Sequence, residues 1–459
     1  MKKLVIIGAG ESGIGAAILA KKEGFDVFVS DFGNISIDQK NELDGLGIVF
    51  EEGKHSLDII LDAHEIVKSP GVPETVSVIQ KAKENGISVI SEIEFASRYT
   101  DAKIIALTGS NGKTTTTLLT YHLLKNAGFN VGLAGNIGES FARKVATNNH
   151  DYYVLEISSF QLDGCYDFKP KVAVLLNITP DHLDRYQNDF DLYAQSKFRI
   201  AQNQDFNDYF ISFTDSKEIA KELPKHRIEA FRLAVSLQNR MLNGAYLSNK
   251  RLMININNHF KSVFSLDLTQ LPLFGDHNMI NTMSAIMAAL AVGVKEEQIT
   301  KSIGLFQNAP HRLEDVAIVN GVRYVNDSKA TNVDAVKYAL DSFEKPIIWI
   351  VGGVDKGNDY KLIEEAVYEK VKAVICLGKD NEKLKKFFEG KVPTIIESSD
   401  MNDTVKVANE LSEGGDHVLL SPACASFDLF ENYEDRGNQF KTAVNRLERS
   451  QPSLNSIVF

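Results

Sequence analysis

Short apolar runs alternate with helical stretches through most of the chain, and this alternation restricts the possible folds more than any other feature. The runs lie at residues 4–7, 27–30, 66–68, 104–108, 153–156, 172–177, 347–351, 373–377 and 417–421. Continuous apolar runs of this length are typical of strands buried on both faces, and intervening helices are typical of βαβ units. The pattern therefore predicts an α/β protein with parallel sheets, whose ligand-binding loops follow the carboxyl ends of the strands.

Two segments divide the chain. At about 150 residues per domain, a length of 459 residues predicts roughly three domains. A link at residues 91–100 follows the first α/β unit, and residues 307–310 end a helical stretch before another strand. The predicted domains are 1–97, 98–308 and 309–459. Short alternating runs within 205–270 predict an antiparallel edge in the central domain.

Composition excludes several classes of protein. Lys and Arg number 50 against 61 Asp and Glu, a net charge of −11, which argues against a general nucleic-acid binder. The sequence contains no uninterrupted apolar run of about 18 residues, so no membrane span is predicted. The start at Met1 imitates a signal peptide, but its apolar run stops at Gly8 and predicts a first strand instead. The three separate cysteines, Cys165, Cys376 and Cys424, predict neither a disulfide framework nor a thiolate metal site, and we expect a cytoplasmic, reducing setting.

The first glycine-rich loop follows the first predicted strand. Residues 8–13 read GAGESG, a full GxGxxG pattern before a helix, and Asp31 ends the next strand. Glycines let a phosphate approach the backbone at a helix N-terminus, so the pattern predicts nucleotide binding, with Asp31 on a ribose. The alternative is a turn that only packs the helix on the strand. Residues 69–73 (SPGVP) predict a rigid turn at the same edge.

A second glycine-rich loop follows the strand at 104–108. Residues 108–115 read TGSNGKTT, which resembles a Walker A loop, although the first glycine of that pattern would fall at Leu107. Backbone N–H groups would cradle phosphates, Lys113 would bind the β- and γ-phosphates, and Thr114 would bind Mg²⁺. The loop therefore predicts ATP binding.

Polar residues follow the next two strands. Glu156 ends one strand, and Asn177 leads from the other into Asp181 and His182. Hard oxygen ligands near an ATP loop favour Mg²⁺ over a capping or surface role. By its pattern alone, Lys197 would be an ordinary solvated lysine on a helix.

Several motifs in order resemble the Mur ligases, ATP-dependent amino-acid ligases that build the peptide stem of peptidoglycan. They are residues 108–115, 135–138, 156–162, 177–184, Lys197, 275–278 with Asn281, 310–314 and 326–332. The resemblance covers nearly the whole chain. It implies three α/β domains: a Rossmann-like N-terminal domain, a central P-loop ATPase-like parallel sheet with an antiparallel edge, and a Rossmann-like C-terminal domain.

Within the family, residues 8–13, 420–428 and 435–437 resemble the branch that adds D-glutamate. This implies joining of D-glutamate to UDP-N-acetylmuramoyl-L-alanine through an acyl phosphate. It also implies ATP, two Mg²⁺ ions, CO₂ bound as a lysine carbamate, a monomer, and no nucleic-acid or membrane partner.

The resemblance also implies a role for individual residues. Those implied for the UDP-substrate are Gly10, Glu11, Ser12, Asp31, Phe32, Ser69, Pro70, Gly71, Asn136 and His182. Those implied for ATP are Gly109, Ser110, Asn111, Gly112, Lys113, Thr114, Thr115, Asn278, Arg312 and Asp327. Those implied for D-glutamate are Lys329, Thr331, Lys356, Ser426 and Phe427. The implied metal ligands are Thr114, Glu156, His182 and carbamylated Lys197, and the implied catalytic set is Lys113, Lys197, His182 and Asp181.

Some alternatives stay open at this stage. His182 or Asp181 could act as the base. Family members often have Phe where this chain has Tyr433, which changes one wall of the D-glutamate pocket. Rival functions are a dinucleotide-dependent oxidoreductase, a non-enzymatic ATP-binding regulator, and another ligase of the family, including its folate-polyglutamate relative.

Overall fold

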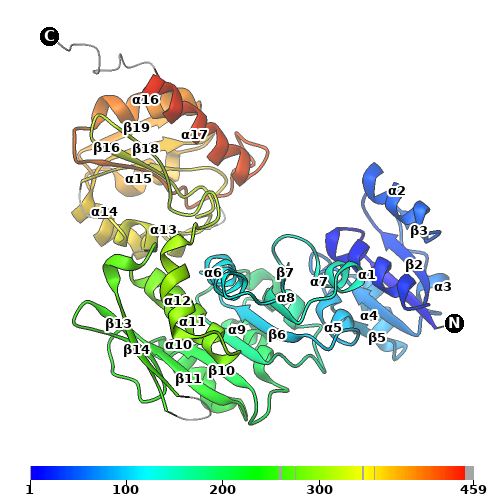
Figure 1. Ribbon diagram of the computed structural model, residues 1–459. Coiled ribbons are helices and arrows are strands. Elements are labelled where there is room, and N and C mark those ends of the chain that lie inside the picture. The colour runs from blue at the N-terminus through cyan, green and yellow to red at the C-terminus, as the bar shows by residue number, and fades with distance from the viewer. Residues whose placement is uncertain (1, 258–260, 274, 344–345, 356, 450–459) are drawn as a thin grey trace. The chain divides into compact units, whose positions relative to one another are not determined.

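The computed structural model describes residues 2–257, 261–273, 275–343, 346–355 and 357–449 (Figure 1). They belong to two compact units, one within 1–273 and 278–306 and the other within 274–277 and 307–459. Each unit is an α/β structure, as the alternation of apolar runs and helical stretches predicts. Among the described helices, none combines the length and apolar character that crossing a membrane requires.

The first sheet of the first unit is fully parallel, in the order β3-β2-β1-β4-β5. Its strands are β1 (Lys3–Ile7), β2 (Asp26–Asp31), β3 (Val49–Glu52), β4 (Glu65–Lys68) and β5 (Ser88–Ile90). Its helices are α1 (Glu11–Lys22), α2 (Ile37–Gly45), α3 (Leu57–Ile60), α4 (Ser77–Glu84) and α5 (Glu92–Ser97). The chain order reverses between β1 and β4, which places the loops after these two strands at the crevice where such sheets bind ligands.

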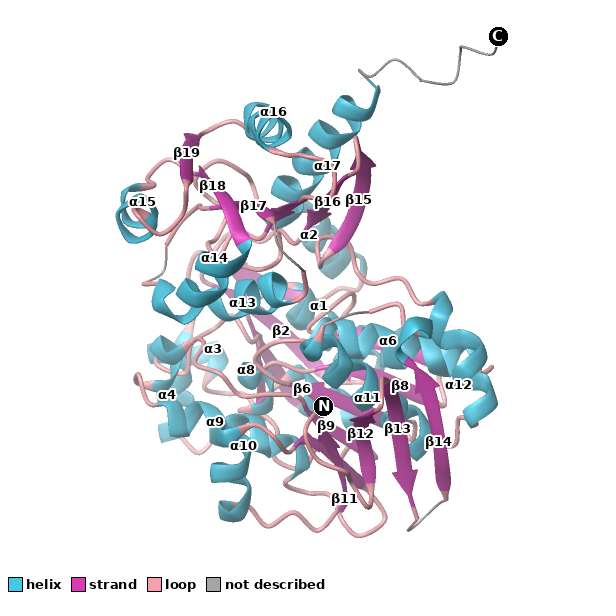
Figure 2. Ribbon diagram, turned by 90° about the vertical axis from the view of Figure 1, so that its left-hand side faces the viewer, coloured by secondary structure: helices cyan, strands magenta, loops and turns pink. Residues whose placement is uncertain are grey.

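The second sheet of this unit has nine strands in the order β14-β13-β12-β11-β10-β9-β6-β8-β7. They are β6 (Lys103–Thr108), β7 (Val131–Gly135), β8 (Tyr152–Glu156), β9 (Val172–Leu175), β10 (Tyr209–Phe213), β11 (Phe231–Ser236), β12 (Gly244–Ser248), β13 (Arg251–Ile256) and β14 (Ser262–Asp267). Strands β12, β13 and β14 pair antiparallel at one edge, visible side by side in Figure 2. The predicted antiparallel edge is confirmed for these strands, whereas β10 and β11 of the same segment pair parallel.

The helices associated with this sheet are α6 (Lys113–Asn126), α7 (Phe141–Thr147), α8 (Ser159–Leu162), α9 (Phe190–Phe198), α10 (Lys217–Glu222), α11 (Asp276–Ala291) and α12 (Glu296–Ser302). Short 3₁₀ helices of the first unit are η1 (Leu183–Tyr186), η2 (Arg199–Ala201), η3 (Leu223–Lys225), η4 (Leu268–Gln270) and η5 (Ile303–Leu305). One apolar core joins side chains of α1 and α5 to side chains of α7, α8 and α9. The two sheets of this unit therefore share a continuous core.

The second unit has a six-stranded sheet in the order β15-β16-β20-β17-β18-β19, with only β15 and β16 antiparallel. Its strands are β15 (Glu314–Val319), β16 (Val322–Asn326), β17 (Ile347–Val351), β18 (Val371–Leu377), β19 (Thr394–Ser398) and β20 (His417–Leu420). Its helices are α13 (Val333–Asp341), η6 (Tyr360–Ile363), α14 (Glu364–Lys370), α15 (Glu382–Phe388), α16 (Met401–Leu411) and α17 (Tyr433–Arg449). Two apolar clusters place α13, α14 and α15 on one face and α16 and α17 on the other.

All nine apolar runs predicted as strands are strands in the structure, with small differences at their ends. Strand β9 ends at Leu175, two residues before the predicted end, because Asn177 turns to bind the backbone of Asn111. The predicted link at 91–100 contains the helix α5. The division into three domains stays a prediction.

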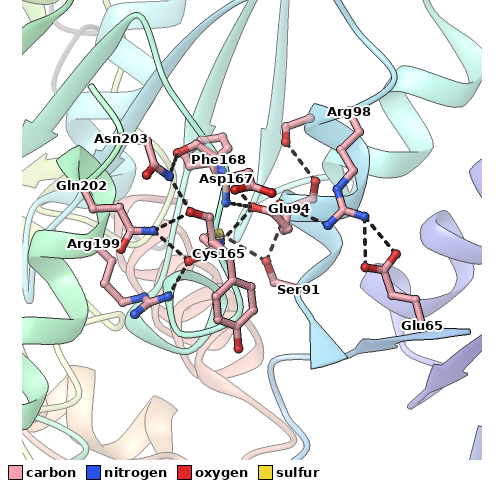
Figure 3. A network of polar contacts seen from close by, with 12 residues as sticks. Glu65, Ser91, Glu94, Arg98, Cys165, Asp167, Phe168, Arg199, Gln202 and Asn203 are labelled. Carbon is pink, nitrogen blue, oxygen red and sulfur yellow. Dashed lines mark hydrogen bonds and ion pairs between the residues drawn. The ribbon is translucent and has the colours of Figure 1, made fainter. Parts of the chain in front are cut away.

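A buried carboxylate ties the first sheet to the second (Figure 3). Glu94, in α5, is fully buried, and its Oε2 accepts the backbone N–H groups of Tyr166 (3.0 Å), Asp167 (3.1 Å) and Phe168 (2.8 Å). Arg98 Nη2 donates to the other oxygen at 3.2 Å. An ionised acceptor makes stronger hydrogen bonds than a neutral one, so this carboxylate holds the segment before β9 against α5.

We predict that Glu94→Ala lowers the free energy of unfolding by about 3–5 kcal/mol, because three backbone N–H groups and Arg98 lose a buried, charged acceptor. Urea denaturation measures the change. Glu65→Ala is the matched control, since Glu65 binds the same arginine at 2.9 Å but lies nearer the surface, and it should cost less than about 1 kcal/mol. Equal losses in the two variants would contradict the central role of Glu94.

Candidate active site

The loop between β6 and α6, here called the phosphate loop (residues 108–113), is held in shape by contacts to two neighbouring elements. The N–H of Asn111 donates to Asn177 Oδ1 at 2.8 Å. Gly112 precedes α6 with φ +81°, and a Cβ at this position would lie 2.3 Å from Asn281 Oδ1 on α11. A positive φ and this close approach both require glycine, which explains the residue that the motif places here.

Lys113 begins α6 and folds back over the phosphate loop. Its Nζ donates to the carbonyls of Gly109 (2.8 Å) and Ser110 (2.9 Å), while Thr114 and Thr115 follow, buried, in the helix. The N-terminus of a helix presents N–H groups and partial positive charge. An ammonium and a helix N-terminus are therefore brought together at one loop, as binding of nucleotide phosphates requires.

A carboxylate at the end of β8 faces the start of α6. Thr114 Oγ1 donates to Glu156 Oε2 at 2.8 Å, and Asn136 Nδ2 donates to Glu156 Oε1 at 2.8 Å. A hydroxyl, an amide and a carboxylate are the hard oxygen ligands that Mg²⁺ prefers. The donor set fits that ion, and the structure brings the predicted ligands Thr114 and Glu156 together.

Lys197, on α9, is buried beside the phosphate loop. Its Nζ donates to the carbonyl of Gly109 at 2.9 Å and lies 4.6 Å from the ring centroid of Tyr193. Burial, with the charge of Lys113 as the next cause, lowers the pKa of Lys197 well below its usual value. The charged form of this amine is therefore less stable here than in water. The surface lysine expected from the pattern alone is not what the structure contains.

His182 and Asp181 lie together in the loop before η1. His182 has φ +51°, and its Nε2 is 3.5 Å from Asp181 Oδ2. Its ring centroid is 5.2 Å from that of Phe160, and its side chain is about half exposed. Throughout the described part of the chain, no three His, Cys, Asp or Glu side chains converge as a metal centre would. A metal role for His182 stays a prediction.

The first glycine-rich loop is shaped by two side chains at the crevice of the first sheet. The N–H groups of Ala9 (2.6 Å) and Gly33 (2.7 Å) donate to the two oxygens of Asp31. The hydroxyl of Ser69 donates to the carbonyl of Gly8 at 2.9 Å. Asp31 and Ser69, both predicted for the UDP-substrate, thus order the loop that a ligand would meet.

Beside this loop lies a mostly apolar pocket of about 610 Å³. It is lined by Gly8, Asp31, Phe32, His55, Leu57, Gly71, Val72, Pro73, Val76, Ser77 and Val78. The predicted residues Asp31, Phe32 and Gly71 are among them, while His55 was missed by the sequence analysis. His55 follows β3, and only the parallel pairing of β3 with β2 brings it beside Phe32. No spacing in the sequence indicates that neighbour.

Other predicted UDP-substrate residues lie at the start of α1. Gly10 precedes the helix, and Glu11 and Ser12 form its first turn. The carboxylate of Glu11 turns to Arg143, whose Nε donates to it at 2.8 Å. Burial opposes the charge of Glu11, but its bonds with Arg143 and Ser140 together lower its pKa. A substrate role for Glu11 therefore stays a prediction.

The turn after β4 contacts the second sheet of the same unit. Arg185, in η1, donates to the carbonyls of Pro70 (3.3 Å) and Gly71 (3.4 Å). Its guanidinium lies 4.5 Å from the ring centroid of Phe160. The predicted substrate turn is thereby joined to the loop that carries His182.

Asn278 lies on α11 beside the phosphate loop. It is buried, and its Oδ1 accepts a hydrogen bond from Asn281 Nδ2 at 3.1 Å. Asn281 is the residue that approaches Gly112. Asn278 is therefore linked to the phosphate loop through Asn281, and its contact with ATP stays a prediction.

In the second unit, Asp327 is a buried acid at the end of β16. The hydroxyl of Ser421 donates to its Oδ2 at 3.0 Å, and the N–H of Leu313 donates to its Oδ1 at 3.2 Å. Burial raises the pKa of Asp327 to about 7, although the hydrogen bonds from Ser421 and Leu313 and the charge of Arg312 each lower it. Arg312 and Asp327, both predicted for ATP, are thus neighbours within this unit.

Lys329 lies over the ring of Tyr433. Its Nζ is 3.6 Å from the ring centroid, a cation–π contact. The ring also meets His311 edge-on, with centroids 6.1 Å apart. The position where family members often have Phe is therefore an aromatic platform under a residue predicted to bind D-glutamate.

The other residues predicted for D-glutamate have different surroundings. Thr331 is half-buried, Ser426 is buried, and Phe427 is 72% exposed. Lys356 lies outside the described residues. The structure leaves the composition of this pocket a prediction.

The sequence matches known families along its length. Residues 2–91 match the family described as "Mur ligase MurD-like, N-terminal domain", residues 107–289 match "Mur ligase middle domain", and residues 311–424 match "Mur ligase, glutamate ligase domain". A protein of Christiangramia forsetii named UDP-N-acetylmuramoylalanine--D-glutamate ligase is 52% identical over 97% of this chain and 100% of its own. The chain belongs to the Mur ligase family.

Further relatives of this Mur ligase carry the same name. The protein of Porphyromonas gingivalis is 52% identical over 96% of this chain and 98% of its own, and that of Salinibacter ruber is 42% identical over 97% and 98%. Among solved structures, UDP-N-acetylmuramate-alanine ligase of Thermotoga maritima matches 98% of this chain and 100% of its own, with a TM-score of 0.60 at 16% identity. At that identity the structural match supports the Mur ligase fold alone.

We predict that Gly112→Ala lowers the affinity of this Mur ligase for ATP by at least about tenfold, because the new Cβ meets Asn281 and the phosphate loop must move. Isothermal titration calorimetry with ATP measures the loss. Gly128→Ala is the matched control, since φ is +85° there and nothing lies within 4 Å of the added Cβ. An ATP affinity of Gly112→Ala as high as that of Gly128→Ala would contradict the prediction.

Proposed function

We propose that this Mur ligase joins D-glutamate to UDP-N-acetylmuramoyl-L-alanine at the expense of ATP. The main support is 52% sequence identity, over nearly the full length of both chains, with proteins named UDP-N-acetylmuramoylalanine--D-glutamate ligase. The phosphate loop supports the ATP half of the reaction through Lys113 and the N-terminus of α6.

In the first step, a carboxylate oxygen of the substrate alanine attacks the γ-phosphorus of ATP. The bond from that phosphorus to the bridging oxygen of ADP breaks, and an acyl phosphate forms. Lys113 and the helix N-terminus offset the charge that moves through the phosphoryl group. Thr114 and Glu156 would hold Mg²⁺, which when bound neutralises phosphate charge.

In the second step, the amine of D-glutamate attacks the acyl carbon and inorganic phosphate leaves. The amine loses a proton, for which His182 and Asp181, 3.5 Å apart, are the proposed acceptors. Lys329, resting on the ring of Tyr433, is proposed to bind a carboxylate of D-glutamate. The fuller proposed set for this amino acid is Lys329, Thr331, Lys356, Ser426 and Phe427.

Each domain has a proposed role. Residues 1–97 are proposed to bind the UDP-substrate, residues 98–308 to bind ATP, and residues 309–459 to bind D-glutamate. Arg312 and Asp327 are also proposed to bind ATP. A cytoplasmic setting is supported by three cysteines that are buried and free.

The decisive experiment is phosphate release from ATP with UDP-N-acetylmuramoyl-L-alanine and each of D-glutamate, L-glutamate, L-alanine and a diamino acid. We expect release with D-glutamate alone. Lys113→Ala should remain folded and release phosphate at least about a hundredfold more slowly, because it lacks the charge beside the phosphates. Release with another amino acid, ATP binding without any release, or full activity of Lys113→Ala would each overturn part of the proposal.

We also propose that Lys197 is carbamylated by CO₂ and contributes to binding two Mg²⁺ ions. The amine attacks the carbon of CO₂, a C–N bond forms, and a proton is released to water. Support comes from the buried amine, which has a carbonyl partner at 2.9 Å, and whose pKa is lowered by burial and by the charge of a second lysine, Lys113. A carbamate would replace this amine with a carboxylate-like ligand.

For this modification we predict a ¹³C NMR carbamate signal after incubation with ¹³C-bicarbonate, absent in Lys197→Ala and kept in the exposed control Lys217→Ala. Lys197→Ala should be nearly inactive, and a small carboxylic acid should restore part of the activity by occupying the place of the carbamate. A fully active enzyme with an unmodified amine would contradict the assignment.

A further inference from the structure

The pocket beside the first glycine-rich loop has apolar walls and one ring that can make a hydrogen bond. Phe32 stands at this pocket 74% exposed, and its ring centroid lies 6.0 Å from that of His55 at an angle of 40°. An exposed aromatic ring at the edge of a pocket offers a face on which a planar ligand can stack. The pocket volume of about 610 Å³ is in the range of small-molecule and cofactor sites.

A hydrogen-bond network fixes the tautomer of His55. Ser30 is fully buried, and its hydroxyl donates to Glu51 Oε1 at 2.8 Å while lying 2.7 Å from His55 Nδ1. A hydroxyl has one proton, and a charged carboxylate is the stronger acceptor. Despite burial, bonds from Ser56 and Ser30 lower the pKa of Glu51, so this acceptor is ionised. Ser30 therefore accepts from His55, and Nδ1 carries the proton.

The remaining nitrogen of His55 is then a hydrogen-bond acceptor. Burial lowers the pKa of His55, although the negative charges of Glu51 and Asp31 act in the opposite direction. The lowered pKa favours the neutral ring. In a neutral imidazole with the proton on Nδ1, Nε2 offers a lone pair. Nothing in the described structure bonds to that atom, and His55 lines the pocket.

We propose that His55 Nε2 selects uracil by accepting its N3–H, while Phe32 stacks on the base. Uracil carries a proton at N3, whereas cytosine presents a lone pair there and would face the lone pair of Nε2. His55 is thus a specificity-determining residue and Ser30 a positioning residue that acts through it. The inference rests on the proposed UDP-substrate and names the residue that reads its base.

The test is calorimetric binding of UDP, CDP and N3-methyl-UDP to the full-length parent protein. We expect UDP to bind at least about tenfold more tightly than either analogue, the effect of one lost hydrogen bond with an unpaired partner. His55→Phe keeps a ring but no acceptor, so it should bind UDP and CDP alike. Phe32→Leu, the matched control, should weaken both nucleotides and keep their ratio.

The positioning role of Ser30 has its own measurement. We expect ¹⁵N NMR of the imidazole to show the proton on Nδ1, and Ser30→Ala to reduce the ratio of UDP to CDP affinity, with Ser30→Thr restoring it. A proton on Nε2, or an unchanged ratio in Ser30→Ala, would overturn the tautomer argument.

The outcomes separate this inference from the proposed function. Equal binding of UDP, CDP and N3-methyl-UDP would overturn base selection by His55, while phosphate release with D-glutamate would keep the ligase proposal intact. No UDP binding together with no phosphate release would overturn both. UDP preference that survives in His55→Phe would assign the selection to other groups.

Discussion

Parallel strand pairing is the constraint on which the rest of this structure depends. Because parallel strands end at the same edge of a sheet, loops from distant parts of the chain meet there. Thr114, directly after the phosphate loop, meets Glu156 at the end of β8 for this reason, and the loop after β1 meets Ser69 after β4. The candidate site therefore forms because strand pairing brings residues of separate motifs together.

Buried charged side chains in this protein differ in how many hydrogen-bond partners they have. Glu94 has three backbone N–H groups and an arginine. Arg436 donates to Ser328 Oγ at 3.0 Å and to the carbonyl of Cys424 at 3.2 Å, which joins the loops after β16 and β20. Such groups hold loops in place, because removing either would leave several partners unpaired.

Lys197 is different from these residues. It has one carbonyl acceptor, and the neighbouring charge with the largest effect on its pKa is another cation, Lys113. A buried amine in these surroundings is poorly stabilised as an ammonium, and poorly satisfied titratable groups are typical of functional sites. His55 resembles Lys197 in this respect: its Nδ1 is hydrogen-bonded, its Nε2 has no hydrogen bond within the described residues, and the residue lines the pocket.

The sequence by itself determined the α/β class, the position of each predicted strand, the phosphate loop and the family, since these depend on local apolar runs and short motifs. Only the tertiary structure decided that Lys197 is buried, that His55 lies beside Phe32, and that Lys329 rests on Tyr433. Those facts arise from strand order and from packing between elements far apart in the chain, and neither is encoded in the spacing of neighbouring residues. A lysine on a helix has the same local pattern whether it meets water or the phosphate loop, so its chemistry depends on what the fold packs against it.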